Sequence, residues 1–188
     1  MNKIKQFEGK SYIDNTPRSI KIKRFIWDVV WVLFFRPTPR WALNKWRVSL
    51  LRLFGAKIGK GSRVLPTCKI WAPWNLTMGS YSALGDDVDC YCVDKITIGD
   101  RVTVSQRTFL CSASHDIRSL RLPLMHKPII IEDYAWVCAE CFISPGSIIK
   151  TGVIVAARSV LTKPTNEWYV YAGNPAKEIK QRVVEENE

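Results

Sequence analysis

A six-residue repeat occupies most of the second half of the chain. From residue 131 the chain reads IEDYAW, VCAECF, ISPGSI, IKTGVI, VAARSV and LTKPTN, and every hexad opens on an aliphatic residue. The fifth place is small or slim until the last hexad. A period of six fits neither a helix nor a simple alternating strand. It is the signature of a parallel β-helix, in which each hexad forms one flat side and three hexads form a triangular turn.

An earlier block, residues 58–115, keeps the same period with slips. Two extra residues occur at Leu76–Thr77 and two more at Ile96–Thr97, and a longer interruption spans residues 116–130. Each turn of such a coil buries its apolar face only by stacking on its neighbours. The two blocks therefore predict an all-β solenoid over residues 57–165. The insertion at 116–130 is expected on its surface, where solenoids often carry a binding face.

The first 60 residues carry the whole net positive charge. They hold 14 Lys or Arg against 3 Asp or Glu, whereas residues 61–188 hold 14 of each. The pattern predicts one helix over about residues 19–35 and a second over about 41–54, both rich in tryptophan and basic residues. The apolar run within the first of these helices is only about half as long as the roughly 20 residues that a membrane-spanning helix needs. Segment 1–56 is therefore expected to lie on an anionic membrane surface, to pack on the solenoid or a neighbouring subunit, or both.

The C-terminal segment, residues 166–188, contains the turn signal Gly173-Asn174-Pro175. Residues 176–186 are then predicted to form a short helix that covers the open end of the solenoid. The expected organisation is a basic, aromatic-rich helical segment (1–56), a β-helix (57–165) and a C-terminal turn with a capping helix (166–188).

Six cysteines are present, but neither disulfides nor a zinc site are expected. The N-terminus MNKIKQFEGKSYIDN lacks the apolar core of a signal peptide, so a cytoplasmic location with free thiols is predicted. A zinc site of this kind needs two C-x-x-C pairs, whereas CAEC is a single such pair and CYC is C-x-C. Compact cysteines instead suit the wall or core of a narrow coil. This interpretation applies to Cys68, Cys92, Cys138 and Cys141.

Together, these motifs resemble the hexapeptide-repeat acyltransferases over roughly residues 55–180. The resemblance depends on the hexads, on SASHD, on YAWVCAECFISPGSIIKTGVIVAARSVLTK and on YVYAGNPAKEIKQR. WRVSLLRLFGAKIG and PWNLTMGSYSALGDDVDCYCVDKITIGD make it most similar to the acetyltransferases of colanic acid biosynthesis. The resemblance implies a left-handed coil, a homotrimer with active sites between subunits, and acetyl-CoA as donor. One departure is that Cys138, Ser144 and Ala156 stand where the family usually has glycine at the second place of a hexad.

His115, in LCSASHDIRS, is the candidate catalytic base. It closes its hexad at the start of the 116–130 insertion and matches the family's catalytic histidine. A sugar hydroxyl is a poor nucleophile until its proton is removed. An imidazole, with an ordinary pKa of about 6.5, can take up that proton at neutral pH. Asp116 is either the group that orients the imidazole or a solvated loop carboxylate. His126, the other histidine, either lines the acceptor cleft or is an ordinary loop residue.

The resemblance also assigns binding residues. For the donor it implies backbone contacts from Ala139 and Ala157, and contacts to the nucleotide and its phosphates from Thr162, Lys163, Lys177 and Lys180. For the substrate it suggests Trp136 as a wall of the site. Asp89 and Asp94 are candidate acceptor contacts. Each lysine is equally well explained as a solvated surface charge, and Trp136 as a tryptophan packed on the surface.

The predicted function is transfer of an acetyl group from acetyl-CoA to a saccharide hydroxyl in exopolysaccharide biosynthesis of the colanic-acid kind. The acceptor is either free or lipid-linked, and no metal and no nucleic acid are expected to take part. A γ-class carbonic anhydrase shares the solenoid but needs three histidines on zinc, and the chain has two. The remaining alternatives are a serine or other small-molecule O-acetyltransferase of the same fold, and a non-enzymatic basic scaffold or binding module.

Overall fold

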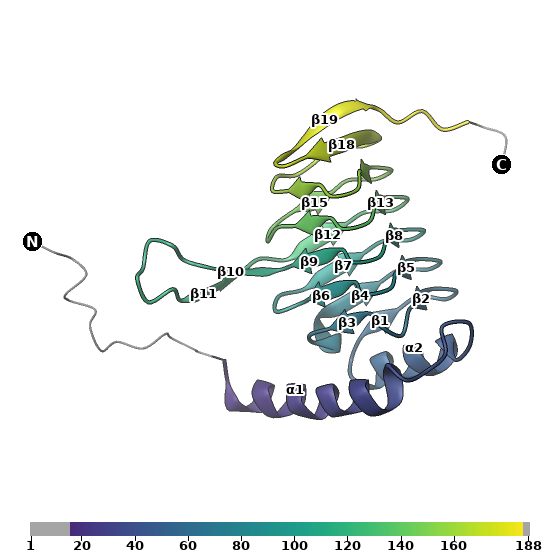
Figure 1. Cartoon of the computed structure of the whole chain (residues 1–188), viewed down its shortest axis with the longest axis vertical. Coiled ribbons are helices and arrows are strands. Elements are labelled where there is room, and N and C mark those ends of the chain that lie inside the picture. Colours follow the sequence, from purple (N-terminus) through teal and green to yellow (C-terminus); the bar gives the residue numbers. More distant parts are fainter. Residues whose placement is uncertain (1–15, 186–188) are drawn as a thin grey trace, which may run out of the picture.

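The computed structural model of the protein describes residues 16–185. The solenoid is a prism of stacked coils whose three sides are parallel β-sheets (Figure 1). Each coil adds one strand to the first, the second and the third sheet in turn, and each strand pairs in parallel with the strand one coil later, as β4 does with β7 and β5 with β8. The all-β solenoid predicted from the period of six is confirmed.

The strands of the prism are short. The first sheet contains β1 (Lys57–Ile58), β4 (Leu76–Met78), β7 (Ile96–Ile98), β12 (Ile129–Ile131) and β15 (Ile148–Ile149). The second sheet contains β2 (Arg63–Val64), β5 (Ala83–Leu84), β8 (Thr103–Val104), β13 (Trp136–Val137), β16 (Ile154–Val155), β18 (Tyr169–Gly173) and β19 (Ala176–Gln181). The third sheet contains β3 (Lys69–Ile70), β6 (Asp89–Tyr91), β9 (Phe109–Cys111), β14 (Phe142–Ile143) and β17 (Val160–Leu161).

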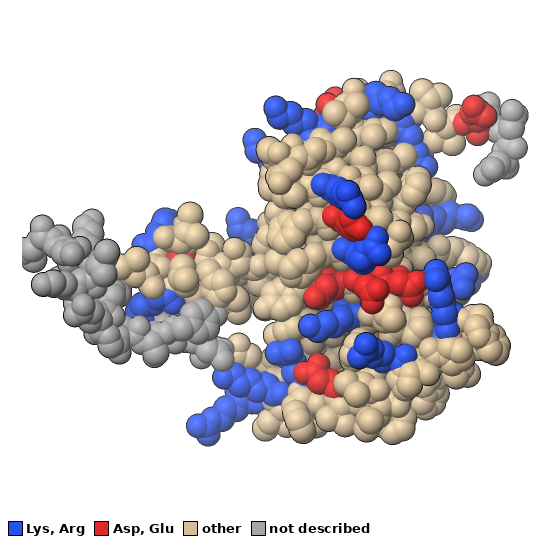
Figure 2. Space-filling model, in the orientation of Figure 1, with Lys and Arg blue, Asp and Glu red and all other residues tan. Residues whose placement is uncertain are grey.

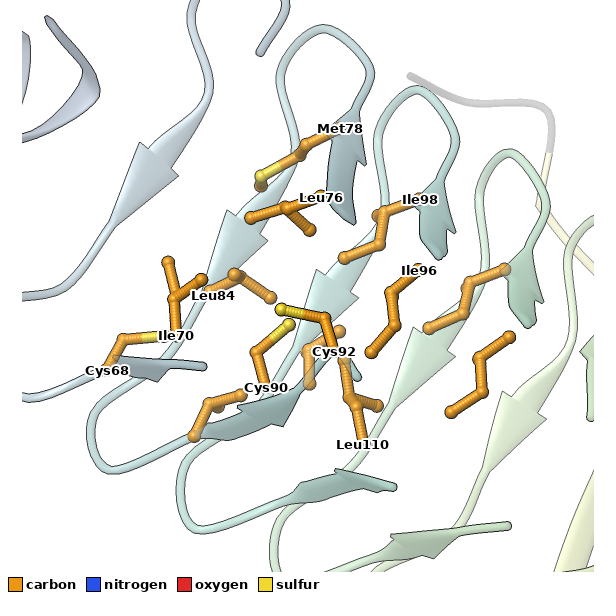
Figure 3. Packing of buried hydrophobic residues seen from close by; sticks show 14 of the residues in the cluster. Cys68, Ile70, Leu76, Met78, Leu84, Cys90, Cys92, Ile96, Ile98 and Leu110 are labelled. Carbon is orange, nitrogen blue, oxygen red and sulfur yellow. The ribbon is translucent and has the colours of Figure 1, made fainter. Parts of the chain in front are cut away.

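The residues that open the hexads form the core. Every opener from Ile58 to Leu161 is buried, and residues of successive coils stack along the axis, as Ile70, Cys90 and Leu110 do (Figure 3). Small fifth-place residues such as Ala135 are buried as well. A fully buried aliphatic side chain contributes about 1.5–3 kcal/mol relative to an exposed one. The repeated opener is therefore what holds one coil on the next.

The cysteines belong to this core and wall. All six are free thiols; Cys68, Cys92 and Cys141 are buried and Cys138 is half-buried. Burial raises the pKa of the Cys68 and Cys141 thiols, so both stay protonated at neutral pH and act as compact apolar residues. Within residues 16–185, no three His, Cys, Asp or Glu side chains gather as the ligands of a metal ion would.

The interruptions of the repeat all fall at one corner of the prism, between the third and the first sheet. The extra residues lengthen the strands that begin there, and Leu76, Ile96 and Ile129 are paired neighbours in successive coils, all buried. Each interruption follows three complete hexads, which make one turn of the coil. Successive interruptions are therefore brought into one column, called here the interrupted corner.

Two helical elements lie across the N-terminal end of the solenoid (Figure 1). They are α1 (Arg18–Val30), continued by the π-helical turn η2 (Trp31–Phe35), and α2 (Asn44–Leu53). The two predicted helices are confirmed, with the second beginning three residues later than expected. The first fifteen residues of the basic segment lie outside the described residues.

Buried polar contacts fix these helices to the first coils. The Trp27 ring is fully buried, and its Nε1–H donates to the Ile70 carbonyl over 2.7 Å. The Arg47 guanidinium is also buried and donates to the carbonyls of Val64 and Ala42, each over 2.8 Å. A buried cation whose donors are satisfied is costly to remove, because the acceptors would be left unpaired. Packing on the solenoid is thus confirmed for the inner face of the helices.

The C-terminal end differs from the prediction. Residues 176–181 form strand β19, which pairs antiparallel with β18, and residues 182–185 have no regular structure, so the predicted helix over 176–186 is wrong; Glu186 lies outside the described residues. The physical reason is the sheet edge. The last coil would leave a row of backbone N–H and C=O groups unpaired. Pairing these groups outweighs the helix propensity of KEIKQ, which is a weak preference that tertiary contacts override.

Candidate active site

A two-stranded hairpin projects from the interrupted corner (Figure 1). It pairs β10 (Ala113–His115) antiparallel with β11 (Leu124–His126). The insertion therefore leaves the wall at residue 113 and not at residue 116, because pairing with β11 draws the last three residues of their hexad into the hairpin. β12 already belongs to the solenoid from residue 129. His115 thus stands on the hairpin itself.

The imidazole of His115 is oriented by a backbone carbonyl. Its Nδ1 lies 2.7 Å from the Leu122 oxygen, and Leu122 has a left-handed backbone conformation with φ of 44°. A carbonyl oxygen can only accept a hydrogen bond, so Nδ1 carries the proton in the neutral ring. The lone pair is then on Nε2. This is the tautomer that a base acting through Nε2 requires.

Asp116 bonds to a different partner. Its carboxylate accepts from the Arg118 guanidinium, with Oδ1 2.9 Å from Nε and Oδ2 3.0 Å from the terminal nitrogen. The side-chain hydrogen bond from Arg118 lowers the pKa of the Asp116 carboxyl. The Leu122 carbonyl, and not Asp116, holds Nδ1 of His115. Asp116 therefore pairs with Arg118 within its loop and does not hold Nδ1 of His115.

The second histidine forms a hydrogen bond with the solenoid. Nδ1 of His126 lies 2.7 Å from Oδ2 of Asp94, which sits at the interrupted corner between β6 and β7. Burial raises the pKa of the Asp94 carboxyl, but hydrogen bonds from His126 and from the Lys95 backbone outweigh burial and lower it. Asp94 therefore orients His126 as Leu122 orients His115. Neither interpretation of His126 made from the sequence included this contact.

Both histidines stand on one face of the hairpin. Directly opposed residues of an antiparallel pair share a face, as do alternate residues along one strand. His115 opposes Leu124, and Ala113 opposes His126. The face that carries the two imidazoles therefore also carries Leu124.

A cleft of about 400 Å³ borders this face. Its lining consists of Thr16, Pro17, Ile20, Trp71, Trp74, Asn75, Val93, Leu124 and His126. It thus lies between the start of α1, the corner residues of two coils and β11. Lys23 and Arg24 stack on the rings of Trp74 and Trp71, each with its charge 4.0 Å from the ring centroid. Aromatic walls with a few oriented polar groups are typical of sites for small organic ligands.

The two carboxylates proposed as acceptor contacts lie in different places. Asp94 stands beside the hairpin, whereas Asp89 belongs to β6 on the third sheet. Burial raises the pKa of the Asp89 carboxyl, and its Oδ1 is buried with no hydrogen-bond partner among the described residues. Asp89 does not line the cleft.

The residues expected to hold the donor occupy another part of the prism. Ala139 and Ala157 lie at the corner between the second and the third sheet, called here the regular corner, because each follows a second-sheet strand and precedes a third-sheet strand. Thr162 and Lys163 directly follow β17, and all but the half-buried Ala139 are exposed.

The remaining expected binding residues, two lysines for the donor and Trp136 for the substrate, lie on the second sheet. Lys177 and Lys180 are exposed on β19. Trp136 is on β13, and its Nε1–H donates to the Ser105 hydroxyl over 2.9 Å. One chain therefore does not bring the expected donor residues together with His115.

Sequence reasoning missed Trp71, Trp74 and Asn75 as site residues. The signal was present, because PWN directly precedes the first slip and the next two interruptions follow at the same phase of the coil. That phase places Trp74 and Asn75 in the column from which the hairpin leaves.

Comparison with known proteins supports a single class. No family model matches the chain. A relative from Escherichia coli strain K12, named "Putative colanic acid biosynthesis acetyltransferase WcaF", is 42% identical over 162 residues, which cover 86% of this chain and 88% of the relative. A maltose O-acetyltransferase from Clostridium difficile 630 superposes with a TM-score of 0.77 at 25% identity, covering 96% of each chain.

A more distant structure agrees in fold. A hexapeptide-repeat-containing acetyltransferase from Vibrio cholerae, solved with acetyl-CoA, has a TM-score of 0.73 at 20% identity and covers 98% of this chain and 100% of that chain. The period, the prism and these likenesses define a left-handed β-helix acyltransferase of the hexapeptide-repeat class. Within that class, the chain belongs to the WcaF family of acetyltransferases.

Proposed function

We propose that the protein transfers the acetyl group of acetyl-CoA to a saccharide hydroxyl in exopolysaccharide biosynthesis of the colanic-acid kind. The observation that carries the proposal is the orientation of His115: the Leu122 carbonyl holds its Nδ1, and the residue shares a hairpin face with Leu124 and His126, which line an aromatic cleft. The names of two relatives support a saccharide as the acetyl acceptor. One is the WcaF protein, and another, 28% identical over 110 residues, is named as a lipopolysaccharide biosynthesis O-acetyl transferase.

His115 is the general base in this proposal. Its Nε2 takes the proton of the acceptor hydroxyl while the hydroxyl oxygen attacks the thioester carbonyl carbon. When the tetrahedral intermediate collapses, the carbon–sulfur bond breaks and the CoA thiolate takes the proton back from the imidazolium. A positioned base of this kind contributes about 10²–10⁴ to the rate.

The donor is proposed to bind at the regular corner of a neighbouring copy. Of the residues expected to contact CoA, Ala139 and Ala157 lie there, Thr162 and Lys163 directly follow β17 of the third sheet, and Lys177 and Lys180 lie on the second sheet. A homotrimer would bring the hairpin of one subunit to the regular corner of the next, so each site would be complete only between two subunits. Exposed Lys177 and Lys180 supply positive charge for the nucleotide phosphates.

The acceptor is proposed to bind in the cleft on the hairpin face. Trp71 and Trp74 offer flat apolar surfaces to a sugar ring, and the oriented His126 offers a hydrogen bond to a hydroxyl. Asp94 acts through His126 as a positioning residue. The reaction is assigned to the cytoplasm, because unpaired cysteines are typical of a reducing compartment.

The test is CoA release by the full-length protein with acetyl-CoA and a panel of acceptors. The panel contains the monosaccharides of the exopolysaccharide, their nucleotide-linked and lipid-linked forms, and serine. Saccharide-dependent release of CoA, with an acetylated sugar found by mass spectrometry, is the expected result. Turnover of serine without turnover of any saccharide would establish the small-molecule alternative instead.

A further inference from the structure

The side of α1 and η2 that faces away from the solenoid is apolar. Large apolar side chains recur along it three and four residues apart, on the side opposite the buried Trp27, and Phe25 is 70% exposed. This surface, called here the outer face, consists of Ile22, Phe25, Ile26, Val29, Val32, Leu33 and Phe34, all exposed. Monomeric soluble proteins rarely leave a contiguous apolar surface of this length uncovered.

The outer face lies at one end of the molecule. α1 crosses the N-terminal end of the prism, so its outer face points away from the coils (Figure 1). The segment that follows adds Trp41, which is 88% exposed, and Leu43, while α2 adds Trp46 and Leu53. Tryptophans beside an apolar stripe are typical of segments that lie at the boundary between lipid and water.

The charge of this end matches an anionic surface. Residues 16–60 contain eleven Lys or Arg and one acidic residue, Asp28, whereas residues 61–188 are neutral overall. Figure 2 shows basic side chains at the end of the molecule where α1 begins, beside an edge that is mostly uncharged. A second copy seated on this face would bring two strongly basic ends together. Anionic lipid headgroups instead attract such a segment.

No helix among residues 16–185 is both long enough and apolar enough to cross a bilayer. We propose that the outer face binds the surface of an anionic phospholipid bilayer, with α1 and η2 lying in the plane of the interface. The apolar side chains enter the boundary between headgroups and acyl chains, and the flanking cations meet lipid phosphates.

The proposed docking has a consequence for catalysis that rests on the proposed function. Thr16, Pro17 and Ile20 at the start of α1 line the cleft beside the histidine hairpin. The same helix therefore contacts the membrane with one side and the acceptor cleft with its first turn. This brings the cleft next to the bilayer and favours an acceptor carried on a membrane lipid over one free in solution.

The experiment is flotation of the full-length protein with vesicles of phosphatidylcholine and phosphatidylglycerol in a 3:1 ratio, and with phosphatidylcholine alone. The test variant is Phe25→Ser with Leu33→Ser. The matched control is Ile117→Ser with Leu120→Ser, because Leu33 and Leu120 are each 58% exposed while Ile117 and Leu120 lie in the hairpin loop. We expect binding to the anionic vesicles at low salt, weakening as salt rises, and about a tenfold or greater loss in the test variant only.

Three results would overturn the proposal. They are no flotation of the wild-type protein at low salt, equal flotation of the wild type and the test variant, and a change of assembly mass in the test variant in place of lost flotation. The last result would make the outer face a subunit contact. Flotation needs no turnover, and the test variant should keep wild-type activity on a water-soluble acceptor, so failure here is distinguishable from failure of the proposed reaction.

Discussion

The interrupted corner and the regular corner belong to the same coils but differ in what the chain does there. At the regular corner every hexad passes to the next without an extra residue, and ion pairs of Glu140 with Arg107 and Arg158 link successive coils there. At the interrupted corner three successive turns receive extra residues, and the last of these interruptions becomes the hairpin with both histidines. Repetition thus builds the scaffold, and the largest departure from it carries both histidines.

The sharpest test of this difference is His115→Ala. We expect kcat to fall by about 10²–10⁴, because the acceptor hydroxyl would lose its base. The KM for acetyl-CoA should stay near the wild-type value, since none of the residues proposed to hold the donor belongs to the hairpin. Initial-rate kinetics with both substrates varied would measure the two constants. A variant that turns over within threefold of the wild type would remove His115 from the mechanism.

The second test compares a coil residue with a hairpin residue nearby in sequence. Leu110 on β9 is fully buried, and Leu110→Ala should lower the free energy of unfolding by about 2–5 kcal/mol through lost burial and a residual cavity. Ile117, which is 88% exposed in the hairpin loop, should lose no more than about 0.5 kcal/mol on change to alanine. Chemical denaturation of both variants measures the difference. Equal losses would mean that the hairpin is part of the folding core.

The contrast between corners also explains what the sequence could predict. The buried openers and the paired strands follow from the period of six, because an aliphatic residue in every hexad can be satisfied only by coils that stack. The convergence of the interruptions was also encoded, since each follows three hexads. The period could not predict the strand pairing inside the insertion, because this antiparallel pairing depends on residues 124–126 and not on the repeat. As a result, His115 lies on the hairpin and not on the solenoid wall.

The prediction for the N-terminal end was correct and the prediction for the C-terminal end was wrong, for a related reason. The N-terminal helices were predictable because their apolar spacing matches a helix and their inner residues, such as Trp27, have a coil to pack against. The C-terminal stretch 176–181 has helical propensity, but an unpaired sheet edge lies beside it, and such an edge cannot be inferred from the local residues alone. The Asp94–His126 pair was missed in the same way, because its members are 32 residues apart and meet only when the hairpin folds against the corner.

The smallest expected effect comes from Asp94→Asn, which keeps the shape of the side chain and removes its charge. The KM for the acceptor should rise about threefold to tenfold, because His126 would lose a charge-assisted hydrogen bond that orients it. The pKa of the Asp94 carboxyl is lowered in the folded protein, so its stabilising contribution is complete above the ordinary Asp pKa of about 3.9 and is lost as pH falls through the lowered value.

Thermal unfolding at several pH values checks the second part of this prediction. The wild type should be slightly more stable than Asp94→Asn from pH 5 to 8, with the difference shrinking below about pH 4 as the wild-type carboxyl takes up a proton. His126→Gln should raise the KM for the acceptor to a similar extent, and combining it with Asp94→Asn should add little, because both changes break one contact. Additive effects of the two changes would mean that Asp94 contacts the acceptor directly and does not act through His126.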